Sequence, residues 1–403
     1  MMLSACQRFD SSVPEGWALA PIGKRIALEY GSGLTDIERT RGAYQVFGSN
    51  GPVGTHDTYL VEGPGVLVGR KGSVGEVHFS DGNFWPIDTV YYVTLKTGDD
   101  LRYIACLLEF LRLDNLNAAT GVPGLTRRDA LFMFGAFPPL AEQIRIAETL
   151  KAADDHIRAL EDRHRKANRA AVALDQAHFA AGPDDVKFPY EYGTARTIPT
   201  GWPSMPLGKF ADVTSGITLN QDREAAGNGV RYLTVINVHR GRIDLTEVRH
   251  LELRGNEAET KRIAPGDIMV IEGHASSAEI GRAALATVRE EGMSFQNHLF
   301  RIRVADAEQL RPRFLVRALN SARIRRHWVA TANTSSGLNT INRTALRRLI
   351  LPVPTPTEQD AIIERLEAAE AAVTALRNNL TAAHRVKQSL LQNLLTGKIR
   401  LKP

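Results

Sequence analysis

Hydrophobic residues recur with heptad spacing in two long segments of the chain. In each segment, apolar or small residues are separated alternately by four and three positions, from Ile146 to Leu174 and from Ile362 to Leu390. The apolar residues of these seams are Ile146, Leu150, Ile157, Leu160, Leu174, Ile362, Leu366, Val373, Leu376, Leu380 and Leu390. A sustained period of 3.5 residues predicts two helices that supercoil around a partner, and the natural partner of each is the other.

Glycine and polar residues mark the limits of these helices. Gly182-Pro183 is expected to end the first helix and Gly397 the second, each with a left-handed cap. His164 and Lys387 interrupt the seams. A polar seam residue usually sets the register of a helix pair or reaches solvent at its end, so we interpret both as structural.

The rest of the chain also shows an internal sequence repeat. The motif around Trp17, Pro14-Glu15-Gly16-Trp17, has a counterpart around Trp202 at an offset of 202 − 17 = 185. PPLAEQIRIAETL, which starts at Pro138, has a counterpart in PTPTEQDAIIERL, which starts at Pro354 (354 − 138 = 216). Between these landmarks, Gly65-Val66-Leu67-Val68 aligns with residues 266–269, and Gly124-Leu125-Thr126 with residues 337–339. Insertions between fixed landmarks are typical of surface loops.

Short strands and helices are predicted outside the seams. Strands are expected at 66–68, 89–95 and 298–304, and matching helices at 102–111 and 313–325. The fold class is therefore α+β, with two mixed α/β domains and two long helices packed as an antiparallel coiled coil in an internal pseudo-twofold repeat. The predicted divisions are a first domain at 1–137, a central helix at 138–180, a second domain at 181–353 and a C-terminal helix at 354–403.

Composition adds a few limits. The 403 residues, 43% of them hydrophobic and 24% charged, are ordinary for globular domains. No apolar run approaches the roughly 20 residues that cross a bilayer, so a cytoplasmic protein without a membrane partner is expected. Cys6 and Cys106 lack metal-ligand spacing, and Cys106 is expected to be a buried thiol. The net charge of +5 is compatible with an anionic partner.

The sequence offers little for catalysis. No phosphate-binding GxxxxGK[ST] motif and no HExxH motif occurs, and no Asn or Asp precedes a Pro-Pro pair. Asp267 and Glu272 resemble part of a metal-dependent nuclease motif, but no lysine stands two residues after Glu272. We therefore expect no catalytic, metal or cofactor site in this chain.

Three segments carry a resemblance to a known family. PPLAEQIRIAETL, PTPTEQDAIIERL and the ending VKQSLLQNLLTGKIRL resemble the specificity (S) subunit, HsdS, of type I restriction-modification systems. The resemblance covers the whole chain. It implies two target-recognition domains that each read one half of a bipartite, asymmetric double-stranded DNA target, and paired helices that set the gap between half-sites and dock two methyltransferase subunits.

The same resemblance implies a division of labour. S-adenosylmethionine, ATP and Mg²⁺ are expected on partner chains, which include restriction and translocase subunits, and this chain is expected to be non-catalytic. The alternatives are a coiled-coil adaptor without DNA reading, a nuclease or methyltransferase that acts alone, and a specificity module for a methyltransferase in a system without the type I motor.

Candidate DNA contacts lie in turns that contain glycine or polar residues. Arginine can bind guanine with two hydrogen bonds, asparagine can bind adenine, and backbone N–H groups in glycine turns suit phosphate. The candidates in the first domain are Ser49, Asn50, Arg70, Lys71, Thr126, Arg127 and Arg128; those in the second are His274, Ser276, Ser277, Gln296, Asn297, His298 and Asn342. Glu272 is expected to occupy the position of Lys71, where it could accept a hydrogen bond from cytosine.

Overall fold

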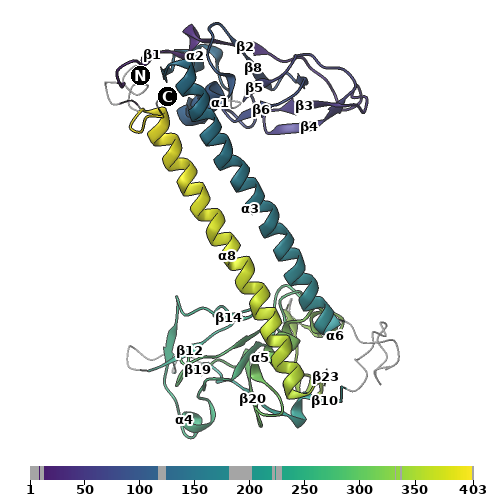
Figure 1. Ribbon diagram of the computed structural model, residues 1–403. Coiled ribbons are helices and arrows are strands. Elements are labelled where there is room, and N and C mark those ends of the chain that lie inside the picture. Colours follow the sequence, from purple (N-terminus) through teal and green to yellow (C-terminus); the bar gives the residue numbers. More distant parts are fainter. Residues whose placement is uncertain are drawn as a thin grey trace. The chain divides into compact units, whose positions relative to one another are not determined.

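The structure, a computed structural model, describes residues 9, 13–116, 124–180, 202–219, 223, 229–331, 333–335 and 338–401. The chain forms two compact units, of which unit 1 comprises residues 1–163 and 376–403 and unit 2 comprises residues 164–375. Figure 1 labels many of the elements of each unit. Among the described residues, no helix combines the length and the apolar character needed to span a membrane.

The described residues of unit 1 form three sheets. An antiparallel four-stranded sheet has the order β2-β8-β5-β6, a second sheet has the order β4-β3-β7, and β1 pairs with β9. Their bounds are β1 Ala18–Pro21, β2 Ile26–Tyr30, β3 Tyr44–Gly48, β4 Gly51–His56, β5 Gly65–Gly69, β6 Val77–Ser80, β7 Phe84–Pro86, β8 Val90–Leu95 and β9 Phe134–Phe137. Helix α1 (Leu101–Leu111) packs on β5 and β6, and α2 (Arg127–Phe132) leads into β9.

Unit 2 repeats this topology. The sheets β11-β20-β16-β18, β15-β12-β19 and β10-β23 take the places of the three sheets of unit 1. Their bounds are β10 Ser204–Pro206, β11 Ala211–Ser215, β12 Val230–Leu233, β15 Arg249–Leu251, β16 Ile268–Ile271, β18 Ala283–Leu285, β19 Ser294–Phe295, β20 Leu299–Val304 and β23 Ile350–Pro352. The sequence repeat is thus a repeat of strand order and pairing.

Unit 2 also carries elements that have no counterpart among the described residues of unit 1. These are β13 (Val238–His239), β14 (Arg242–Ile243) and α4 (Glu257–Thr260), together with the sheet β17-β22-β21, formed by Gly273–His274, Leu338–Thr340 and Asn333–Ser335. They lie between shared strands, as expected for insertions into surface loops.

The prediction of a single continuous helix at 313–325 is wrong, because the structure has two helices there, separated at Ser321. Helix α5 (Pro312–Asn320) ends before Ser321, whose backbone is extended, and α6 (Ala322–Thr331) follows. The Asn320 side chain exchanges hydrogen bonds with the backbone of Ala283 in β18, and the Ser321 hydroxyl accepts from the Ile324 N–H. These side-chain bonds end one helix and begin the next.

The long helices are α3 (Leu140–Ala180) and α8 (Pro356–Leu395). In unit 1, the end of α8 packs along the beginning of α3: Leu391 and Leu394 share a core with Ile146 and Leu150. In unit 2, the beginning of α8 and the end of α3 pack on a common core that includes Ile362, Leu366 and Leu174. In unit 1 the two helix segments run in opposite directions, because Arg400, just beyond α8, pairs with Glu142 at the start of α3, and Lys387, earlier in α8, pairs with Asp154 further along α3. In unit 2, the start of α8 and the end of α3 also run in opposite directions (Figure 1).

Every predicted seam residue is buried or half-buried. Ile146, Leu150, Ile157, Leu160, Ile362 and Leu366 are buried, and Leu174, Val373, Leu376, Leu380 and Leu390 are half-buried. Gly397 ends α8 in the left-handed region at φ +73°, as predicted. Gly182-Pro183 and Cys6 lie outside the described residues. Cys106, which was predicted to be a buried thiol, is half-buried.

Candidate nucleic-acid interface

The turn between β5 and β6 holds Arg70 and Lys71 at the surface of unit 1. The backbone N–H groups of both residues donate to the Thr89 carbonyl oxygen, at 2.8 and 3.2 Å. Gly69 has no room for a side chain, because a Cβ atom there would lie 1.9 Å from the Ser73 oxygen. The turn is thereby fixed, and Arg70 and Lys71 follow the buried strand β5.

Helix α2 brings the second predicted cluster to the same place. The Arg70 carbonyl accepts from the Leu125 N–H at 2.9 Å, directly before Thr126. Thr126 is the N-cap of α2, and its hydroxyl accepts from the Asp129 N–H at 3.2 Å. Arg127 is the first residue of α2. The predicted residues at 70–71 and 126–127 are therefore neighbours in space.

The guanidinium groups of Arg70 and Arg127 meet on one aromatic ring. Their carbon atoms lie 4.8 and 4.4 Å from the centre of the Tyr30 ring. Tyr30 is 48% exposed and packs on the buried Tyr91, whose hydroxyl donates to the Leu125 carbonyl at 3.0 Å. Burial and then a hydrogen bond with Tyr30 raise the pKa of Tyr91.

Acidic residues offset part of the positive charge of Lys71 and Arg127. The Lys71 ammonium lies 3.9 Å from the Asp88 carboxylate, and Arg127 lies 3.9 Å from Glu29. These distances are long, and the side chains are about half exposed. Such pairs contribute little and leave the cations able to bind phosphate.

The remaining candidates of unit 1 lie near this cluster or along α2. Ser49 is in the β3–β4 turn, and its hydroxyl lies over Gly72, 3.2 Å from where a Cβ atom would stand. Asn50 is exposed beside it. Arg128 is exposed on α2, with its guanidinium carbon 5.6 Å from the centre of the Phe132 ring.

Strand pairing shows which residues of unit 2 occupy the equivalent place. Tyr30 pairs with Tyr91 in the β2–β8 ladder, and Ser215 pairs with Phe300 in the corresponding β11–β20 ladder. Because Tyr91 and Phe300 pair in turn with Val68 and Val270, the offset between the units is 270 − 68 = 202 at this strand.

The expectation that Glu272 corresponds to Lys71 is therefore wrong by one position. Glu272 corresponds to Arg70: the carbonyls of these two residues accept from Ile341 and Leu125, which precede the caps Asn342 and Thr126. The matches of residues 65–68 to 266–269 and of residues 124–126 to 337–339 are wrong as well, since Val68 corresponds to Val270 and Thr126 corresponds to Asn342. The additional residues of unit 2 therefore precede these positions.

The candidates of unit 2 gather around Glu272. His298 Nδ1 lies 3.4 Å from the Glu272 carboxylate, and the His298 carbonyl accepts from the Glu272 N–H at 2.9 Å. Asn342 caps α7 (Arg343–Arg348) by accepting from the Ala345 N–H at 2.8 Å. Arg343 is the first residue of α7, at the place that Arg127 holds in unit 1.

The loops on either side hold the other candidates. His274 Nδ1 accepts from the Ser276 N–H at 3.0 Å, and Ser277 follows in the same turn. The backbone N–H groups of Gln296 and Asn297 donate to the carbonyls of Leu233 and Ile217. The side chains of Gln296 and Asn297 are half-exposed, and that of His298 is exposed.

In each unit, one residue close to the candidates gave no signal in the sequence: Tyr30 in unit 1 and Lys261 in unit 2. Tyr30 is a single aromatic residue whose partners Arg70 and Arg127 lie far along the chain. Lys261 lies far along the chain, but its ammonium donates to the Ser215 carbonyl at 2.7 Å. Burial lowers the pKa of Lys261, as do the nearby cations Arg301 and Arg343.

Other polar clusters have structural roles. Asp267, which resembles part of a nuclease motif in the sequence, is 2% exposed and accepts two hydrogen bonds of 2.7 Å from Arg303. Arg311 and Arg317 form ion pairs with Asp360 and Glu370 of α8. No group of three or more potential metal ligands occurs among the residues that the structure describes.

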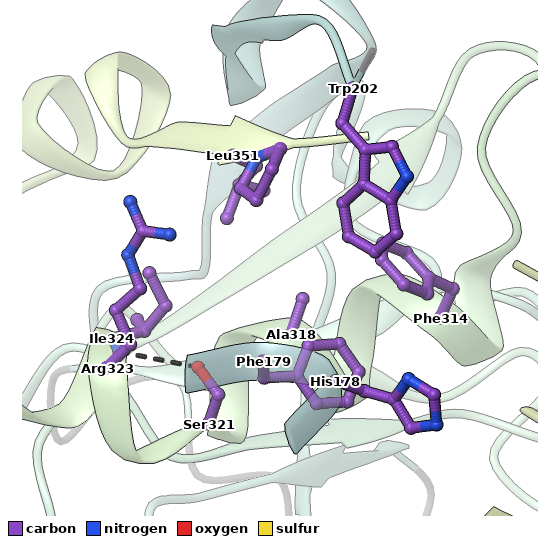
Figure 2. A pocket seen from close by; sticks show the side chains of 10 residues that line it. His178, Phe179, Trp202, Phe314, Ala318, Ser321, Arg323, Ile324 and Leu351 are labelled. Carbon is purple, nitrogen blue, oxygen red and sulfur yellow. Dashed lines mark hydrogen bonds between the residues drawn. The ribbon is translucent and has the colours of Figure 1, made fainter. Parts of the chain in front are cut away.

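Figure 2 shows a pocket in unit 2 that is separate from these candidates. It lies between the end of α3, α5, α6 and β23, and its lining includes Phe179, Trp202, Phe314 and His178. Burial lowers the pKa of His178, and Arg365 lowers it further. The lining is largely apolar and contains none of the predicted DNA contacts.

Several known proteins are similar to this chain in sequence. A family model described as "Type I restriction modification DNA specificity domain" matches residues 32–168 and 199–383. The type I restriction enzyme StySPI specificity subunit of Salmonella potsdam is 26% identical over 267 residues, which cover 65% of this chain and 57% of that relative. The MjaVIII specificity subunit of Methanocaldococcus jannaschii is 25% identical over 313 residues, covering 76% of this chain and 72% of that protein.

Solved structures share the fold. The S subunit of a type I restriction-modification system from M. genitalium has a TM-score of 0.56 at 16% identity, covering 96% of this chain and 97% of that one. The HsdS subunit of Thermoanaerobacter tengcongensis has a TM-score of 0.54 at 16% identity, covering 97% and 99%. Since the family model matches one long stretch before residue 181 and one after it, the chain belongs to the type I restriction-modification DNA specificity family.

Proposed function

We propose that this chain is the DNA specificity subunit of a type I restriction-modification complex and reads a bipartite, asymmetric target. The observation that carries this proposal is the repeated topology with different side chains at one equivalent place. Unit 1 has Tyr30 and Arg70 where unit 2 has Ser215 and Glu272. The arginine at the start of the following helix, Arg127 or Arg343, is common to both units. Two readers of one fold with different surface chemistry suit a target whose halves differ.

The proposed recognition domains are residues 1–137 and 181–353, linked by helices at 138–180 and 354–403. The opposite directions of α3 and α8 within each unit support an antiparallel coiled coil along their whole length. Such a pair would relate the two domains by an approximate twofold axis and set the gap between half-sites. One helical turn of DNA, about 34 to 36 Å, is the natural separation.

Chemistry is assigned to partner chains. Two methyltransferase subunits would dock on the helices and bind S-adenosylmethionine, while restriction subunits would use ATP and Mg²⁺. The assembly would act on DNA in the cytoplasm, and this chain would choose the site without taking part in a chemical step. The relatives described above are specificity subunits of type I restriction enzymes, which supports this assignment.

A test is to purify the chain with its methyltransferase subunits and supply S-adenosylmethionine and duplex DNA. Methylation at a split sequence that requires this chain would support the proposal. The same methylation without the chain would contradict it and favour a coiled-coil adaptor.

A further inference from the structure

The Tyr30 ring is an exposed platform beneath two cations. Tyr30 ends β2, and the chain leaves the strand through Gly31, where a Cβ atom would lie 2.2 Å from the Ile87 carbonyl oxygen. This close approach fixes where the tyrosine stands. Guanidinium carbons 4.8 and 4.4 Å from the ring centre are within the range of cation–π attraction.

Each guanidinium is also held by a backbone carbonyl. Arg70 donates to Asp88 at 3.0 Å, and Arg127 donates to Leu28 at 3.2 Å. A guanidinium carries five N–H donors, so one backbone acceptor leaves donors for a phosphate or for the edge of a guanine. The ring and the carbonyls together restrict two long side chains that would otherwise lose rotamer entropy on binding DNA.

The fold itself does not require this arrangement. Unit 2 builds the same ladder with Ser215 in place of Tyr30 and Glu272 in place of Arg70. A side chain that the fold can replace by serine, and that remains 48% exposed, has no evident role in the core. Its contacts are with the two arginines and with Tyr91.

We propose that Tyr30 is a positioning residue for DNA binding by unit 1, holding the guanidinium groups of Arg70 and Arg127 ready for a backbone phosphate or a guanine edge. This inference rests on the proposed function. Tyr30 acts through the two arginines, so its removal weakens DNA binding. Because tyrosine is neutral, the net charge of the protein stays unchanged.

The test compares Tyr30→Leu and Tyr30→Phe in the full chain with its methyltransferase subunits. Binding to a fluorescein-labelled 40-base-pair duplex pool of random sequence is followed by fluorescence anisotropy. Loss of two cation–π contacts should weaken binding by about tenfold for Tyr30→Leu. Phenylalanine keeps the ring, so Tyr30→Phe should bind within about twofold of the unaltered protein.

Two controls and one substitute variant separate positioning from other effects. Tyr30→Leu should cause no further loss in a protein that already carries Arg70→Ala and Arg127→Ala. Phe79→Leu, which removes a ring 4.0 Å from the Arg102 guanidinium elsewhere in unit 1, should leave binding unchanged. Tyr30→Ser, which installs the residue found at the equivalent place of unit 2, replaces Tyr30→Leu if the leucine variant does not fold.

The outcomes are distinct. Binding by Tyr30→Leu at the level of the unaltered protein overturns the inference, as does an equal loss in the background that lacks both arginines. Failure of the unaltered protein to bind any duplex defeats the proposed function itself.

Discussion

The side-chain oxygen of Gln143 accepts a hydrogen bond of 2.9 Å from the backbone N–H of Asp100. Its amide nitrogen donates to the Pro138 carbonyl at 2.9 Å. The repeat keeps this arrangement: Gln359 accepts from the Arg311 N–H at 2.8 Å and donates to the Pro354 carbonyl at 2.9 Å. In unit 1, the buried Gln143 links the start of α3 to the start of α1. In unit 2, the buried Gln359 links the start of α8 to the start of α5.

Replacing Gln143 by leucine should destabilise unit 1. The leucine would leave the Asp100 N–H and the Pro138 carbonyl buried without this partner, which costs about 1–3 kcal/mol per group. Urea denaturation followed by tryptophan fluorescence measures the loss. Gln392→Leu, at an exposed position of α8, is the matched control and should change little. Equal stabilities of the two variants would contradict this role.

A second prediction concerns Glu142 and pH. Its carboxylate accepts two hydrogen bonds of 2.8 Å from Arg400 and one of 3.1 Å from the Trp17 indole. The Arg400 guanidinium holds the pKa of Glu142 below its usual value of 4.5. Because the folded pKa is the lower one, the stabilisation is complete above the usual value and is lost as the pH falls through the lowered one.

Glu142→Gln should therefore flatten the acid limb of the stability curve. Thermal melting between pH 7 and pH 3 should show a smaller loss of stability on acidification than in the unaltered protein. Arg400→Ala should cost about 3 kcal/mol at pH 7, because it leaves a buried carboxylate without its cation. An acid limb of the same steepness in Glu142→Gln would refute the assignment.

A third prediction concerns the polar residue in the second seam. The Lys387 ammonium lies 2.7 Å from Glu109 and 2.8 Å from Asp154, and its side chain is only 14% exposed. Lys387→Met keeps the volume but leaves two carboxylates facing each other. Because these are more than a third exposed, we expect a modest loss of about 1 kcal/mol. Chemical denaturation beside Lys398→Met, an exposed control, measures it, and a variant more stable than the control would disprove the prediction.

A fourth prediction concerns the DNA contacts of unit 1. Replacing Arg70 and Lys71 together by alanine should weaken duplex binding and reduce the dependence of log K on log salt by roughly two. Only one half of the methylated sequence should become less strict. Anisotropy titrations at several salt concentrations, together with mapping of methylated bases, test this. Unchanged binding and an unchanged sequence would remove these residues from the interface.

The sequence predicted the helices better than the sites. Heptad seams and the Glu-Gln motifs mark α3 and α8 because burial along one face imposes a period that the sequence must carry. The break at Ser321 was not predictable, since it depends on Asn320 reaching β18. The Glu272 alignment was off by one because only strand pairing fixes register. Tyr30 could not be predicted as a site residue because its partners, Arg70 and Arg127, lie 40 and 97 residues away in the sequence (70 − 30 = 40; 127 − 30 = 97).

We propose that this chain selects the DNA sequence at which a methyltransferase acts. Long-read sequencing that detects methylated bases can compare cells that carry the chain and its methyltransferase with cells that lack only this chain. We expect a split, non-palindromic methylated sequence that disappears when the chain is removed. An unchanged set of methylated sites, with an active methyltransferase present, would contradict the account.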